Sequence, residues 1–168
     1  MAAFDQANGA GESIDFKTDQ EKNGTLTYWN RGVSMRPLIR QDKDLFSLKH
    51  KDLVLAERGE TRLRKYDVVL YIRHDGAYVL HRIVQVRAND YAILGDNTYR
   101  LETGITDTDV IAVMTGYARG GEHWHSVEET GYQLYSKIWV GIYPLRKVLV
   151  GIRHLLGRIY RKAFRKKS

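Results

Sequence analysis

The sequence of 168 residues has no cysteine, no long hydrophobic run and no acidic residue after Glu129. Without cysteine, neither disulfides nor thiolate metal ligands are available. The longest uncharged apolar run is Ile138–Leu145, far short of the roughly 20 residues that a membrane-spanning helix needs. Residues 1–24 contain acidic residues and no apolar run, the opposite of a secretory leader. We therefore expect a flexible lead-in over 1–24 and a cytoplasmic protein that does not cross a bilayer by itself.

The charge of the chain is divided unevenly. From Gly131 to Ser168 there are ten Lys or Arg residues and no acid, a charge of +10, whereas residues 1–130 carry 17 basic and 20 acidic side chains, a charge of −3. A basic segment favours an anionic partner such as a lipid headgroup. Nucleic acid is not expected, because stacking aromatics do not accompany the charges in a recognisable module.

The same C-terminal segment has a helical period. Its apolar residues alternate in spacings of four and three, which places them in one stripe on a helix. We predict a basic amphipathic helical tail over 131–168, in which Pro144 would lie in the first turn of the main helix, where its missing N–H has no cost. The stripe could pack on the domain, lie peripherally on the inner face of a membrane, or bind another protein. Its members are Ile138, Ile142, Leu145, Leu149, Ile152, Leu156, Ile159 and Ala163.

Between these segments, short runs rich in Val, Ile, Leu and Tyr alternate with turn residues. Several short strands at close spacing are typical of an antiparallel sheet or barrel. We predict a mainly β domain over 25–130, with a coiled, barrel-like antiparallel sheet. The expected strands are residues 26–29, 45–48, 53–55, 67–72, 78–86, 91–94 and 110–117.

Three short motifs in this region carry residues suited to catalysis. Ser34 lies in the turn-forming segment Gly32–Pro37 (GVSMRP), and a nucleophilic serine needs such an exposed turn with a backbone N–H nearby. His81 lies within an expected strand, and a neighbouring histidine can accept the serine proton. Asp96 and Glu102 follow, and a carboxylate can fix the tautomer of the histidine. Each motif alone also fits an ordinary turn or a packed histidine.

In their order and spacing, these motifs resemble the signal peptidase I family. The run G-x-S-M-x-P, a D-V-V strand, H-R-I and G-D-N span about residues 25–118. The similarity is closest to the endoplasmic-reticulum and archaeal type, which uses His where the bacterial type uses Lys. LexA-type repressors share the fold that the resemblance implies.

The resemblance implies a serine endopeptidase that cleaves a leader or signal-like peptide after small residues. Ser34 would be the nucleophile, with its own N–H in the oxyanion hole, and His81 the general base. Asp96 falls on the acid of the Gly-Asp-Asn motif, and Glu102 falls where eukaryotic-type members have an Asp that supports the His. Which of these two carboxylates orients His81 stays open.

The chain departs from the family pattern at three points. Gly32 stands where bacterial members often have a Ser that assists the oxyanion, Tyr66-Asp67 replaces the usual Gly-Asp, and no membrane anchor is visible. Two alternatives therefore remain: a non-catalytic peptide-binding or membrane-docking module, and a LexA-like protein that cleaves itself, for which Ala10-Gly11 is the candidate bond. In LexA-type proteins a Lys acts as the base, but we interpret Lys51 and Lys65 as solvated charges.

If residues 123–125 were extended, His123 and His125 would fall on one face, where two ligands could begin a metal site. No third ligand has a suitable spacing, so we interpret both as surface histidines. The sequence predicts neither a metal nor a cofactor.

Overall fold

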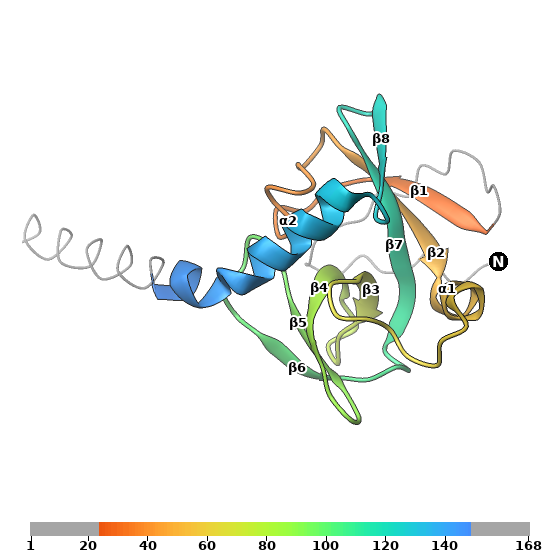
Figure 1. Ribbon diagram of the computed structural model, residues 1–168, viewed down its shortest axis with the longest axis vertical. Coiled ribbons are helices and arrows are strands. Elements are labelled where there is room, and N and C mark those ends of the chain that lie inside the picture. The colour runs from red at the N-terminus through yellow and green to blue at the C-terminus, as the bar shows by residue number, and fades with distance from the viewer. Residues whose placement is uncertain (1–23, 149–168) are drawn as a thin grey trace, which may run out of the picture.

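The computed structural model describes residues 24–148, and its centre is one antiparallel sheet (Figure 1). The strand order is β1-β2-β7-β3-β4-β5-β6, with β8 paired to β7. The predicted mainly β, antiparallel class is therefore confirmed. Over the described residues the edge strands β1 and β6 do not pair with each other, so the sheet is open and does not form a closed barrel. The strands are β1 (Thr25–Trp29), β2 (Leu45–His50), β3 (Val68–Ile72), β4 (Tyr78–Val86), β5 (Tyr91–Leu94), β6 (Glu102–Ile105), β7 (Val110–Arg119) and β8 (His123–Ser126).

Two hydrophobic clusters lie on opposite faces of the central strands. Successive side chains of a strand point to opposite faces, so Val68 and Leu70 of β3 belong to one cluster and Val69 and Tyr71 to the other. The first cluster also contains Met35, Leu38 and Ile39 from the turn that follows Ser34, and Tyr132 from the C-terminal helix. The turn that carries Ser34 is thereby anchored in the core.

The predicted strand at residues 53–55 was wrong, because this segment belongs to helix α1 (Lys51–Arg58). Local signals for a helix outweigh its three apolar residues. The His50 side chain accepts a hydrogen bond from the Asp52 N–H, and Gly59 ends the helix in the left-handed conformation with φ 64°, as is common at helix C-termini. Only Val54 of α1 is buried.

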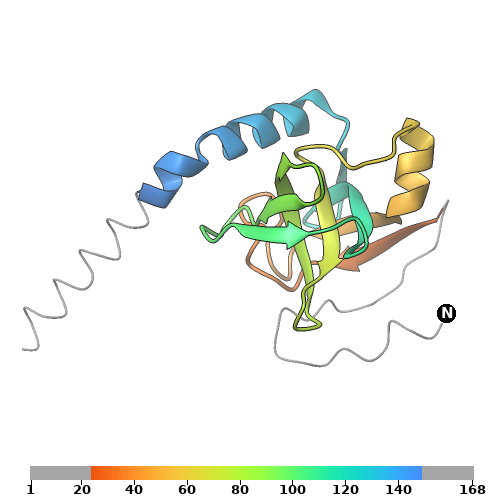
Figure 2. The ribbon, with the colours of Figure 1, turned by 90° about the horizontal axis from the view of Figure 1, so that it is seen from below.

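Helix α2 (Thr130–Gly141) is followed, after Ile142, by further helical residues 143–148. The described part of the predicted tail is therefore helical, with Pro144 in the first turn of this second segment; residues 149–168 lie outside the described part. Figure 2 shows α2 along one side of the sheet, with its C-terminal end extending past the strands. No helix within residues 24–148 is long and apolar enough to cross a membrane.

Candidate active site

Ser34 lies in a tight turn that is hydrogen-bonded to a segment far away in the sequence. The turn closes with a hydrogen bond from the Arg36 N–H to the Val33 carbonyl (3.2 Å) and contains a cis Arg36–Pro37 peptide bond. The Ser34 carbonyl accepts a hydrogen bond from the Asn97 N–H (2.6 Å), and the Asn97 side chain donates to the Val33 carbonyl (3.2 Å). The nucleophile motif is thus fastened to the Gly-Asp-Asn turn.

The Gly-Asp-Asn turn also lies against the His81 ring. A Cβ atom placed on Gly95 would lie 2.7 Å from His81 Nε2 and 2.9 Å from Cδ2, a distance that no side chain tolerates without displacing the ring. The Nε2 edge of His81 therefore faces the backbone of a turn whose Asn97 binds Ser34. His81 itself is 3% exposed, so this orientation is fixed by packing.

The opposite nitrogen of the same ring faces a cluster of polar side chains. His81 Nδ1 lies 3.3 Å from Glu102 Oε1 and 3.3 Å from the Tyr71 hydroxyl. Arg73 donates two hydrogen bonds to the Glu102 carboxylate, at 2.6 and 2.5 Å. A carboxylate at Nδ1 favours the tautomer that leaves Nε2 free to accept a proton, which is the effect that the acid of a serine–histidine–acid triad has on its histidine.

Strand register explains how these side chains meet. His81 in β4 is opposite Val69 in β3, so Tyr71, two residues further on, lies on the same face. On the other side of β4, Ile83 is opposite Ile93, and Ile93 is opposite Glu102 at the start of β6. Tyr71 and Arg73 were not predicted from the sequence. The alternation of β3 and its hairpin with β4 was the signal that could have identified them.

Asp96 lies on the other face of the sheet from the His81 cluster. Both of its carboxylate oxygens accept hydrogen bonds from Arg82, at 2.9 and 2.8 Å, and Oδ2 also accepts one from the Tyr135 hydroxyl (3.0 Å). Arg82 follows His81 in β4 and is completely buried, with further bonds to the hydroxyls of Tyr132 and Ser136. Glu102, rather than Asp96, contacts the histidine, and Asp96 ties the sheet to α2.

The charge state of Glu102 follows from its neighbours. Burial would raise the pKa of Glu102, but hydrogen bonds with His81, Arg73 and Tyr71 outweigh it and hold this pKa far below its ordinary value. Burial, together with the Glu102 charge, raises the pKa of Tyr71. Near neutral pH, Glu102 is therefore a carboxylate and Tyr71 a neutral phenol with one O–H to donate.

This lowered pKa predicts a loss of stability in acid. A glutamate in an unfolded chain titrates at about 4.3, so the contribution of ionised Glu102 is complete above that pH and decreases as the pH falls toward the lower folded-state pKa. We expect the free energy of unfolding, measured with denaturant between about pH 5 and pH 2.5, to decrease less steeply with falling pH for Glu102→Gln than for the wild type. Glu57→Gln, which removes an exposed carboxylate, should follow the wild-type curve; identical curves for all three would contradict the assignment.

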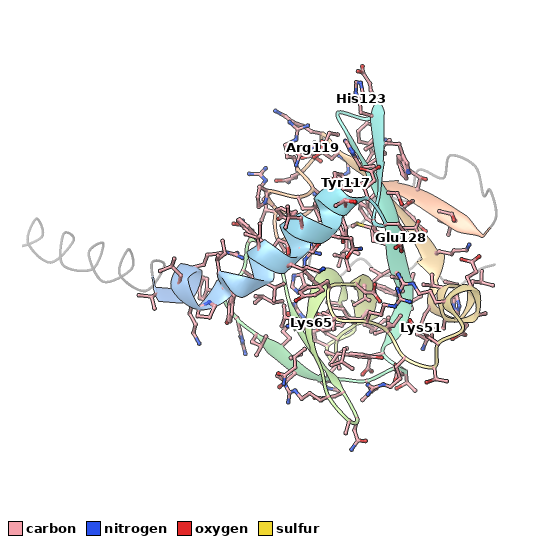
Figure 3. The ribbon with its side chains drawn as sticks, in the orientation of Figure 1. Lys51, Lys65, Tyr117, Arg119, His123 and Glu128 are labelled. Carbon is pink, nitrogen blue, oxygen red and sulfur yellow. The ribbon has the colours of Figure 1, made fainter. Side chains whose placement is uncertain are left out.

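The other candidate groups lie apart from this cluster. Lys51 is on α1, where its ammonium group contacts the Asp107 carbonyl, and Lys65 lies 5.1 Å from the Tyr66 ring (Figure 3). His123 is at the end of the β7–β8 hairpin (Figure 3), and His125 Nδ1 lies 3.2 Å from Glu129 Oε2. Within the described residues, no group of three or more His, Asp or Glu residues could hold a metal ion. Ala10-Gly11, the candidate self-cleavage bond, lies outside the described residues.

A pocket of about 490 Å³ adjoins the Ser34 turn. Asn97, which donates hydrogen bonds to the Val33 and Ser34 carbonyls, is one of its lining residues. From there the pocket extends to α2 and the helical residues beyond it. None of the described residues that line it is acidic. Three cations and three aromatic rings form most of its wall: Arg36, Arg146, Lys147, Tyr99, Trp139 and Tyr143.

Comparison of the chain with models of protein families, with curated proteins and with solved structures found no match.

Proposed function

We propose that the protein is a serine endopeptidase of the signal-peptidase type, on the fold that signal peptidases share with LexA-type proteins. The environment of the His81 ring carries the proposal. Nδ1 faces an ionised carboxylate, and Nε2 faces the turn whose Asn97 holds the carbonyl of Ser34. A carboxylate, an imidazole and a serine turn in this order support nucleophilic catalysis by the serine.

The proposed reaction is hydrolysis of a peptide bond in two steps. Ser34 Oγ attacks the scissile carbonyl carbon while His81 Nε2 accepts the hydroxyl proton, and Glu102 stabilises the resulting imidazolium. The tetrahedral intermediate collapses, the C–N bond breaks, and the proton passes from His81 to the departing amine. Water then attacks the carbonyl carbon of the acyl-enzyme while His81 accepts its proton. The bond between that carbon and Ser34 Oγ breaks, His81 returns the proton to Ser34 Oγ, and the carboxylic acid product leaves.

Substrate would bind as an extended peptide that lengthens the sheet at an edge, a common mode of peptide recognition. The edge strand β1 ends shortly before the Ser34 turn. By the resemblance, small residues precede the scissile bond. The cationic, aromatic pocket beside Ser34 would favour an acidic substrate side chain near that bond. A leader peptide of a cytoplasmic product is the substrate class that we favour.

The proposal is tested by incubating the purified full-length chain with a peptide library and sequencing the products by mass spectrometry. We expect cleavage after small residues, with acidic residues enriched at one nearby position. Absence of cleavage by folded protein, with and without lipid vesicles, would contradict the peptidase function and favour the non-catalytic peptide-binding alternative.

A single methyl group offers a sharper test of the histidine geometry. Gly95→Ala should lower kcat/KM by about tenfold to a hundredfold, because its Cβ would displace the His81 ring, and misplacements of about 1 Å can cost that much. Gly131→Ala is the matched control, since no atom lies within 4 Å of its added Cβ. Equal activity of both variants on a peptide from the library would mean that the position of His81 does not matter for cleavage.

A further inference from the structure

One face of the C-terminal helical region presents a row of large aliphatic side chains to solvent. We call these residues the α2 stripe: Leu134, Ile138, Ile142, Leu145 and Val148, which are 57, 53, 37, 60 and 58% exposed. Their spacings of four and three residues place them on one side of a helix. Single exposed apolar residues are ordinary, but a contiguous apolar surface marks a site of interaction.

The sheet does not cover this stripe because the opposite side of the helix packs on the sheet. Tyr132 and Ser136 are buried and contact Arg82, and Tyr135 and Trp139 donate hydrogen bonds to Asp96. Rotation of α2 to bury the stripe would break these bonds and leave a buried ion pair without its hydroxyl partners. Of the predicted apolar stripe, Ile138, Ile142 and Leu145 lie among the described residues and are exposed there; its other members lie outside the described residues.

We propose that the α2 stripe docks the protein on an anionic lipid membrane. The exposed Lys137 and Lys147 lie on the same helical region, and the chain from Gly131 onward carries a charge of +10. Two copies packed stripe to stripe would bring these like charges together, whereas anionic headgroups neutralise them. An amphipathic helix binds such a surface by lying in its plane with the apolar face about 5–10 Å deep.

The proposal has no dependence on catalysis, so the experiment uses the full chain and, in parallel, the Ser34→Ala variant. Both should co-sediment with phosphatidylcholine vesicles that contain phosphatidylserine, and much less with phosphatidylcholine alone. Added salt should weaken this binding by screening. The double variant Leu134→Gln/Ile138→Gln should lower the vesicle partition coefficient about tenfold or more, given the apolar area removed.

The matched control is Leu53→Gln/Val86→Gln, which changes two aliphatic residues of comparable exposure, 46 and 37%, on other elements; its binding should equal that of the wild type. Because the chain has no cysteine, a polarity-sensitive fluorophore can also be attached at Ile138→Cys or Val86→Cys. Only the label at position 138 should shift to the blue on anionic vesicles, and this result stands even if the glutamine variant does not fold.

Three results would overturn the proposal: no binding of the wild type to anionic vesicles, an equal loss in the control variant, or equal shifts of both labels. If the wild type sedimented as a dimer that Leu134→Gln/Ile138→Gln converts to a monomer, without vesicle binding, the stripe would be an interface between copies.

Discussion

Ser34→Ala should lower kcat/KM for peptide cleavage by about 10³-fold or more, since removal of a triad nucleophile typically has effects of this size or larger. The variant should remain folded, because the turn is held by backbone bonds from Arg36 and Asn97 and by its buried neighbours Met35 and Leu38. These backbone bonds and buried contacts are all present in the alanine variant. The measurement is steady-state hydrolysis of the best peptide from the library.

Three comparison variants make this result specific. Ser126→Ala, on β8, removes a serine hydroxyl far from the motif in sequence and should keep wild-type kcat/KM. His81→Gln should lose about as much activity as Ser34→Ala, and the double variant no more than either, because members of a triad act as a unit. Additive losses would mean that the two residues act separately.

Asp96→Asn should lower the free energy of unfolding by about 3–5 kcal/mol, the usual cost of removing one partner from a buried ion pair. Arg82 is fully buried and Asp96 is 2% exposed, so neither charge is compensated by water. The loss would also loosen α2, whose Tyr135 hydroxyl donates a hydrogen bond to the Asp96 carboxylate. Denaturant unfolding followed by circular dichroism measures the change.

The control for this variant is an exposed pair. Arg31 and Asp42 lie 2.9 Å apart, with side chains 40 and 50% exposed, so Asp42→Asn should cost less than about 1 kcal/mol. Asparagine also tolerates the left-handed backbone of Asp42, with φ 55°. If Asp96→Asn cost no more than Asp42→Asn, the Arg82–Asp96 pair would not be a link between sheet and helix.

The sequence was informative where local pattern decides structure. Alternating apolar runs predicted the central strands and the mainly β class, and the 3/4 spacing after Gly131 predicted a helix. The segment at 53–55 was misassigned because three apolar residues in a row resemble a strand, whereas the helix depends on His50 and Gly59 at its ends. Whether the sheet closes, and which face of α2 packs on it, depends on contacts between distant segments and could not be predicted from spacing.

In the candidate site, too, local motifs could be predicted from the sequence, whereas contacts between distant segments could not. The order of the motifs indicated Ser34 and His81, whose catalytic roles stay predictions. To decide whether Asp96 or Glu102 contacts His81, it was necessary to know which face of the sheet each side chain occupies. Since His81 and Arg82 are neighbours in β4, their side chains point to opposite faces, and each meets a different carboxylate. Tyr66, which replaces the usual Gly, has a φ of 83°, the left-handed region that glycine adopts most easily.

The most direct test of the central claim is to trap the acyl-enzyme. A peptide ester built on the best cleaved sequence would be mixed with the protein, quenched in acid during turnover, digested and analysed by mass spectrometry. We predict an adduct with the mass of the acyl half of the peptide on the fragment that contains Ser34, and no adduct in Ser34→Ala. An adduct on another residue, or turnover by Ser34→Ala at the wild-type rate without any adduct, would contradict the account.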